Sequence, residues 1–262
     1  MIDTHTHLYL DDYNPDKCAA VDRAFAAGVD MMIFPGVDAG SLPQIRELHA
    51  LRPHCTAMCA GLHPTEIDVA TWREHLAAVE EALTVAPDAA DFVAVGEIGL
   101  DLYWEQDKLP LQLEALDAQL DLAHRVNLPV ILHCREALPQ MLDVMRAHAG
   151  RLPQAVFHCF GGTADDVAAI RRVQPDALFG IGGIVTFKKS PLPAVLPEIG
   201  LQHIVLETDA PWLAPVPMRG KQNESSYIPY IAARIAEVLQ LPVADVDAAT
   251  TAAARRLFTK LA

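Results

Sequence analysis

Residues 92–100 read FVAVGEIGL and residues 129–134 read PVILHC, with a helical stretch at 107–126 between them. Each apolar run is short, rich in strand-forming residues and long enough for one buried strand. The same alternation of apolar run and Ala/Leu-rich stretch extends in both directions along the chain. In order, the runs are residues 2–8, 31–37, 56–62, 92–100, 129–134, 155–160, 177–183 and 203–209.

Helical patterns fill the gaps between these runs and follow the last of them. We expect helices over residues 15–27, 72–86, 107–126, 136–149, 163–174, 226–240 and 245–261, with N-caps at Asp38, Thr71 and Thr163. Eight strands, each followed by a helix or helix-like segment, predict an α/β protein of the (β/α)8 TIM-barrel type. A doubly wound open sheet is the alternative. No linker or charge block divides the chain, so we expect one domain over residues 1–262.

Composition excludes several classes of protein. The 262 residues include 20 basic and 34 acidic side chains, a formal charge of −14 that argues against a nucleic-acid coat or an anionic-membrane binder. A hydrophobic content of 52 % excludes disorder. The N-terminus lacks a basic region typical of signal peptides, and the five cysteines form no CxxC pair. We expect a reduced, cytoplasmic protein without membrane association or an obligate protein partner.

Metal-ligating and ionisable side chains recur late in the expected strands, or directly after them. They are His5, His7, His63, Glu97, His133, His158 and Asp209. Active sites of β/α barrels lie at the C-terminal ends of the strands, so these side chains are expected to converge. His5 and His7 are two residues apart in an extended segment, which points both imidazoles to one face, where they can share a metal ion.

The buried carboxylates favour cation binding. Glu97 interrupts an apolar strand and is costly to bury unless it is paired or bound to a cation. Asp209 and Glu207 share one strand parity, and two unpaired buried acids repel each other. Structural ion pairs and hydrogen-bonded core histidines are the alternatives. Six protein ligands are too many for one open catalytic ion, so two ions sharing Glu97 fit better. Nitrogen and oxygen ligands suit Zn²⁺, Mn²⁺, Co²⁺ or Ni²⁺, and Mg²⁺ less naturally.

Ordered motifs along nearly the whole chain resemble the TatD family of metal-dependent hydrolases, within the amidohydrolase superfamily. The matching segments are DTHTHL (3–8), GLHP (61–64), VGEIGLD (95–101), LPVILHCRE (128–136), FHCFGG (157–162), GIGG (180–183), LETDAPWLAP (206–215) and RGKQNE (219–224). The resemblance implies a TIM barrel, two divalent metal ions per chain (Zn, Mn, Mg, Co or Ni), and deoxyribonuclease or phosphodiesterase activity.

The resemblance also implies roles for individual residues. His5, His7 and Asp209 match the ligands of the first metal ion, Glu97 matches the bridging ligand, and His133 and His158 match the ligands of the second. Asp209 would also orient or deprotonate the attacking water. His63 matches a substrate-side residue that helps to hold the scissile phosphate.

We therefore expect a phosphodiesterase or deoxyribonuclease that uses metal-activated water, with nucleic acid as a transient substrate. Arg135, Arg219 and Lys221 are candidates for phosphate contacts. Residues 1–187 hold 12 basic and 27 acidic side chains, whereas residues 188–262 hold 8 and 7. This uneven charge favours a local cationic pocket and exonuclease-like action on strand ends or short substrates, not tracking along a duplex. The alternatives are hydrolysis of another ester, such as an aminoacyl-tRNA or a small phosphoester, and a non-enzymatic metal-binding scaffold.

Overall fold

A parallel sheet of eight strands forms the centre of the protein, in a computed structural model that describes residues 1–13 and 15–261. The strands are β1 (Ile2–Asp3), β2 (Met31–Phe34), β3 (Thr56–Ala60), β4 (Phe92–Asp101), β5 (Val130–Arg135), β6 (Ala155–Phe157), β7 (Leu178–Ile181) and β8 (Ile204–Leu206). Each strand pairs in parallel with the next along the chain. This sequential order excludes the doubly wound sheet, in which the strand order reverses direction.

Backbone contacts between the two ends of the sheet close it into a barrel. The Thr4 amide donates to the Leu206 carbonyl at 2.9 Å, and the Asp209 amide donates to the His5 carbonyl at 2.9 Å. Thr6 and Ala210 form an isolated parallel bridge just beyond the strands. The predicted (β/α)8 barrel is therefore confirmed.

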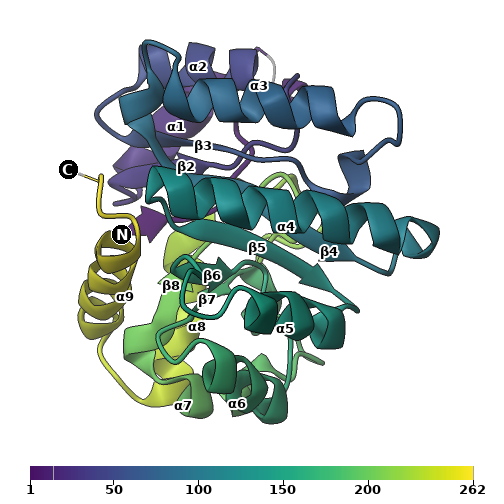
Figure 1. Cartoon of the computed structure of the whole chain (residues 1–262). Helices are drawn as coiled ribbons and strands as arrows, with labels where there is room; N and C mark the ends of the chain where they lie inside the picture. The colour runs from purple at the N-terminus through teal and green to yellow at the C-terminus, as the bar shows by residue number, and fades with distance from the viewer. Residues whose placement is uncertain (14, 262) are drawn as a thin grey trace.

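Helices surround the strands, and both chain ends lie on the same side of the molecule, beside α9 (Figure 1). Their bounds are α1 (Lys17–Ala26), α2 (Leu42–Leu51), α3 (Trp72–Thr84), α4 (Leu109–Val126), α5 (Leu138–Ala147), α6 (Ala164–Val173), α7 (Leu192–Ile199), α8 (Ile228–Leu239) and α9 (Val243–Leu257). In the described part of the chain, no helix is long and apolar enough to cross a membrane. The expected helices are present, with ends that differ by a few residues.

The barrel interior is filled by one apolar cluster, which leaves only the C-terminal end of the barrel open for chemistry. Inward-facing side chains from every strand form it: Ile2, Ile33, Cys59, Val93, Ile131, Val156, Leu178 and Val205. Leu257 and Phe258 belong to the same cluster, and Lys260 donates to the carbonyl of Phe92, the first residue of β4. The end of α9 therefore closes the N-terminal end of the barrel.

Two local expectations need correction. Several strands are shorter than predicted, so His5, His7, His158 and Asp209 lie just after β1, β6 and β8 and not within them. Backbone hydrogen bonds between neighbouring strands continue past these ends, since the His158 amide donates to the Leu132 carbonyl and the Asp209 amide to the His5 carbonyl.

The N-cap of α2 is Ser41 and not Asp38, because the Asp38 carboxylate accepts the Ser41 amide hydrogen bond in a turn before the helix. Thr71 precedes α3 without a capping hydrogen bond, whereas Thr163 forms a complete capping box with Asp166.

Candidate metal centre

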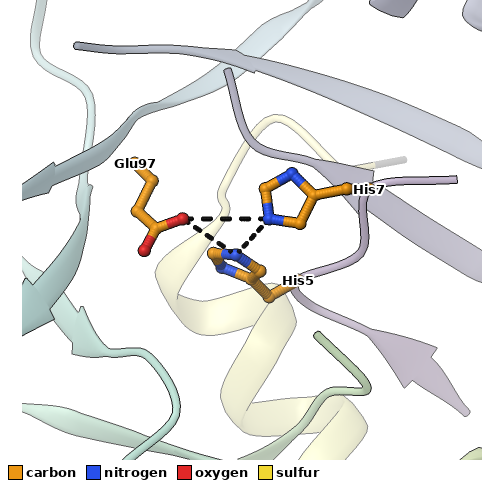
Figure 2. A group of neighbouring side chains, drawn as sticks. All are labelled: His5, His7 and Glu97. Atoms are coloured by element: carbon orange, nitrogen blue, oxygen red, sulfur yellow. Dashed lines mark hydrogen bonds and ion pairs between the residues drawn. The ribbon is translucent and has the colours of Figure 1, made fainter. Parts of the chain in front are cut away.

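The six predicted metal ligands converge around the Glu97 carboxylate. Figure 2 shows His5, His7 and Glu97 pointing toward one another. Glu97 reaches this position because its backbone amide donates to the Gly36 carbonyl at 2.7 Å, across the end of β3. Gly61 permits this approach, since a Cβ atom there would lie 2.7 Å from the Gly96 carbonyl carbon.

The two oxygens of Glu97 face two separate groups of imidazole nitrogens. Oε2 lies 3.1 Å from His5 Nε2 and 3.9 Å from His7 Nε2. Oε1 lies 2.8 Å from His133 Nδ1 and 3.4 Å from His158 Nε2. Asp209 Oδ1 lies between 3.7 and 4.0 Å from the Nε2 atoms of His5, His7 and His158. One carboxylate thus separates two sets of candidate ligands.

Hydrogen bonds behind His7 fix its tautomer. The Tyr9 hydroxyl donates to the Pro35 carbonyl at 2.7 Å, so its oxygen accepts from His7 Nδ1 at 2.9 Å. Burial raises the pKa of Tyr9 well above its ordinary value, so the hydroxyl keeps its proton. His7 Nδ1 therefore carries the hydrogen, and the Nε2 lone pair points into the centre, as metal ligation requires.

His133 and His158 have carboxylates behind them. His133 Nε2 lies 2.9 Å from Asp101 Oδ2, on the side away from Glu97. His158 Nδ1 lies 3.3 Å from Glu207 Oε1, although the two atoms are not aligned as a hydrogen bond. A carboxylate that accepts from the far nitrogen of a ligating imidazole orients the ring and raises its basicity. His7 and His133 thus have the far-nitrogen hydrogen bond typical of metal-binding histidines, and His158 has a carboxylate near its far nitrogen.

His63 lies in the cluster with the opposite tautomer. Its Nδ1 accepts the Thr65 amide hydrogen bond at 3.2 Å, which places the hydrogen of the neutral ring on Nε2. Nε2 lies 3.3 Å from Glu97 Oε1. His63 therefore offers a hydrogen-bond donor to the centre and not a lone pair. Its contact with substrate stays a prediction.

Burial and mutual contacts set the protonation of the cluster. Burial lowers the pKa values of His5, His7 and His158, which keeps these rings neutral. Burial favours the neutral form of Glu97, but the surrounding histidines hold its pKa well below the ordinary value. Burial also opposes the charge of His133, yet hydrogen bonds to Asp101 and Glu97 raise its pKa to about 9.

Burial raises the pKa of Asp209 to about 7, with Glu97 and Glu207 adding to the shift and His158 opposing it. The cluster concentrates acids that a cation would stabilise.

The donor set fits divalent metal ions. Ligand atoms about 2.0–2.2 Å from a tetrahedral ion lie about 3.4 Å from one another. The distances of 3.1 Å from His5 Nε2 to His7 Nε2 and to Glu97 Oε2 are close to this value. His5, His158 and Asp209 form a second compatible group. His63, Glu97 and His133 lie equally close together, but His63 presents a hydrogen and not a lone pair. Imidazole nitrogens and carboxylate oxygens are suitable ligands for Zn²⁺, Mn²⁺, Co²⁺ or Ni²⁺.

A cavity of about 560 Å³ opens onto the cluster, a volume within the range of about 300–1,000 Å³ typical of small-ligand sites. His63 and Arg135 line it together with five of the predicted ligands: His7, Glu97, His133, His158 and Asp209. Arg219 and Lys221 are exposed and do not line it, and the Arg219 guanidinium lies 4.1 Å from the centre of the Phe187 ring. The fold thus brings two of the four predicted substrate contacts to the cluster.

Comparisons with known proteins decide the family. Residues 2–259 match the family described as TatD related DNase. The chain belongs to the TatD family. Among curated relatives, it is 33 % identical to an uncharacterised metal-dependent hydrolase, YabD, of Bacillus subtilis, with 98 % of each chain covered. It is 36 % identical to the TatD protein of Edwardsiella piscicida, named a 3'-5' ssDNA/RNA exonuclease, with 98 % of this chain and 99 % of the relative covered.

The crystal structure of YjjV, a TatD homologue of Escherichia coli K12, superposes with a TM-score of 0.89 at 30 % identity, covering 99 % of this chain and 98 % of that one. This chain is therefore a TatD-family metal-dependent hydrolase, as its motifs indicate.

Sequence reasoning missed Asp101 and Tyr9 behind the predicted ligands, and it identified Glu207 only as an inward carboxylate beside Asp209. Asp101 ends the GEIGLD motif and shares strand parity with Glu97, a pattern that could have indicated a second inward carboxylate. Glu207 fits only because Gly180 lacks a side chain: a Cβ atom there would lie 2.0 Å from Glu207 Oε2. The sequence carries no comparable indication for Tyr9, whose role depends on a contact with the distant Pro35 carbonyl.

Proposed function

We propose that this protein is a metal-dependent phosphodiesterase that removes nucleotides from the ends of single-stranded nucleic acid, with two divalent ions bound per chain. The observation that carries the proposal is the division of the Glu97 carboxylate between two groups of imidazoles, His5 with His7 and His133 with His158. Paired ions that share a carboxylate suit phosphoester displacement. The exonuclease names of relatives at 34 % and 36 % identity support this substrate and a 3'-to-5' direction.

In this proposal, His5, His7 and Asp209 would hold one ion, His133 and His158 would hold the other, and Glu97 would be shared between them. Bound divalent ions supply Lewis-acid activation of water and charge neutralisation at the phosphate. The residues around the ions have separate roles. Tyr9 and Asp101 orient the imidazoles of His7 and His133 by hydrogen bonds, and Glu207 lies beside the far nitrogen of His158.

Asp209 is placed to accept a proton from the attacking water, because its carboxylate lines the cavity and lies within 4.0 Å of three imidazoles. His63 offers an N–H donor beside Glu97, and Arg135 offers a guanidinium at the cavity wall. Both groups suit the non-bridging oxygens of a phosphodiester. General-base catalysis by Asp209 would contribute about 10²–10⁴-fold in rate.

Parallel digestion of four substrates tests the proposal. End-labelled single-stranded DNA, duplex DNA, an aminoacyl-tRNA and a small phosphodiester would be incubated with protein reloaded with Mn²⁺, Zn²⁺, Co²⁺, Ni²⁺ or Mg²⁺. We expect stepwise shortening of the single strand from its 3' end, slower action on the duplex, and no activity in Glu97→Gln. Exclusive cleavage of the aminoacyl ester would replace the proposed substrate. Full metal occupancy without hydrolysis of any substrate would favour a metal-binding scaffold.

A further inference from the structure

Two tryptophans are exposed at the mouth of the cavity that contains the metal centre. Trp104 follows β4 and is 65 % exposed, and Trp212 follows β8 and is 51 % exposed. Both rings line the same cavity as Glu97. The chain has three tryptophans, and the third, Trp72, is 5 % exposed and packs in an apolar cluster. Exposed indoles that line a functional cavity indicate a surface that a ligand covers.

The barrel topology puts these two rings on opposite sides of the metal centre. β4 and β8 are four strands apart in a closed sheet of eight, so the loops that follow them face each other across the mouth. Glu97 lies on β4, and Asp209 follows β8. A polymer whose reacting bond lies at Glu97 and Asp209 would therefore extend toward Trp104 on one side and Trp212 on the other.

Hydrogen bonds and a cation–π contact order the turn that carries Trp104. Asp101 Oδ1 accepts the backbone amides of Tyr103 and Trp104 at 2.9 and 2.8 Å. The Arg135 guanidinium lies 3.9 Å from the centre of the Tyr103 ring and 5.5 Å from that of Trp104. The other oxygen of Asp101 contacts His133. The Asp101 carboxylate thus connects the turn that carries Trp104 to His133, a predicted metal ligand. Because this turn is already ordered, it loses little conformational entropy when a substrate binds.

The Trp212 ring has its own support. The Trp212 amide donates to the Asp209 carbonyl at 2.9 Å, and the Trp212 carbonyl accepts from the Asn223 side-chain amide at 2.6 Å. Its ring lies 5.3 Å from the His7 ring, at an interplanar angle of 67°. The indole therefore contacts a predicted ligand in a T-shaped arrangement, and Trp212 keeps about half of its surface free.

We propose that Trp104 and Trp212 each stack on a nucleobase, one on either side of the scissile phosphodiester. This inference rests on the proposed function. It identifies unpaired nucleobases as the feature of the substrate that the two tryptophans at the cavity mouth recognise. An aromatic face stacks on any unpaired base, which gives affinity without strict sequence preference. Bases inside a duplex are already stacked on one another, so the two indole rings would favour single strands and frayed ends.

Substrates with matched backbones test the stacking. One single-stranded oligonucleotide carries all of its bases, and a second has abasic tetrahydrofuran residues at the two terminal positions. In the wild-type protein we expect the abasic ends to lower kcat/KM by about 10-fold or more, since stacking on one aromatic ring changes affinity by about 5- to 150-fold. Trp104→Ala and Trp212→Ala would each lower kcat/KM on the normal strand and reduce the penalty for missing bases.

Two controls separate stacking from structural damage. Trp104→Phe and Trp212→Phe keep an aromatic face and are expected to restore most of the activity on the normal strand. Phe25→Ala removes an aromatic side chain that is 60 % exposed on α1 and does not line the cavity, so it should behave as wild type on both substrates. Equal kcat/KM values for normal and abasic strands in the wild-type protein would overturn the stacking proposal while the phosphodiesterase proposal stands.

A binding measurement separates this inference from turnover. The indole fluorescence of the Glu97→Gln variant would be titrated with oligothymidylate. We expect quenching that decreases when Trp104→Ala or Trp212→Ala is added and is retained when Phe25→Ala is added. If no substrate is hydrolysed yet quenching depends on both tryptophans, the phosphodiesterase proposal fails and the base-stacking site stands. Quenching that is insensitive to both substitutions would contradict the stacking site.

Discussion

Replacing Tyr9 with Phe should weaken metal binding without touching a predicted ligand. The change removes a hydroxyl that accepts from His7 Nδ1 at 2.9 Å and donates to the Pro35 carbonyl at 2.7 Å. Without that acceptor, the His7 ring loses both its orientation and the preference for the tautomer with a lone pair on Nε2. The ligand therefore presents the wrong protonation state part of the time.

The magnitudes follow from the two lost hydrogen bonds. Loss of the group that orients a metal-ligating imidazole costs about 10- to 100-fold in metal affinity. The Pro35 carbonyl keeps no side-chain donor, and an unsatisfied buried polar group costs about 1–3 kcal/mol of stability. Isothermal titration of chelator-treated protein with Mn²⁺ measures the first effect, and urea unfolding in chelator measures the second.

Tyr13→Phe is the matched control. Tyr13 is also buried, and its hydroxyl also donates to a backbone carbonyl, that of Asn223, but within residues 1–13 and 15–261 it forms no hydrogen bond with a histidine of the cluster. We expect Tyr13→Phe to lose a similar free energy of unfolding and to keep wild-type Mn²⁺ affinity. If Tyr9→Phe also kept wild-type affinity while losing stability, the assignment of the His7 tautomer would be refuted.

Three further predictions concern the metal centre and the packing around it. Glu97→Gln should lower metal-dependent turnover by about 100-fold or more, since both ligand groups lose the carboxylate that they share. A wild-type rate in the folded variant would contradict a bridging role for Glu97. Gly180→Ala should cost about 1–3 kcal/mol in urea unfolding because its Cβ would meet Glu207 Oε2 at 2.0 Å, whereas Gly182→Ala, whose nearest such contact is 3.5 Å, should be near neutral. Adding Mn²⁺ at about 100 times its Kd should stabilise the chelator-treated protein by about 2.7 kcal/mol for each ion bound, and a melting temperature that does not change with metal would count against a formed site.

Strand parity made much of the barrel interior predictable. His133 comes two residues after Ile131, and His158 comes two residues after Val156, so the inward direction of each apolar side chain carries over to the histidine. The paired spacing of His5 and His7 is informative for the same reason. These relations depend on neighbours along one strand, and such local geometry can be read from a sequence.

Long-range contacts account for what the sequence did not reveal. Tyr9 matters through Pro35, 26 residues away, and Asp101 matters through His133, 32 residues away. Arg219 comes from a motif that implies substrate contact, yet its guanidinium packs over Phe187 and outside the cavity. A phosphate contact by Arg219 or Lys221 stays a prediction. The path of a long loop is set by tertiary packing, which spacing alone does not specify.

Anomalous diffraction from crystals grown with Mn²⁺ tests the central claim most directly. We predict two anomalous peaks, one on each side of the Glu97 carboxylate. One peak should lie within bonding distance of His5 and His7, and the other of His133 and His158. A single peak, or peaks that do not share Glu97, would contradict a two-ion centre bridged by this carboxylate.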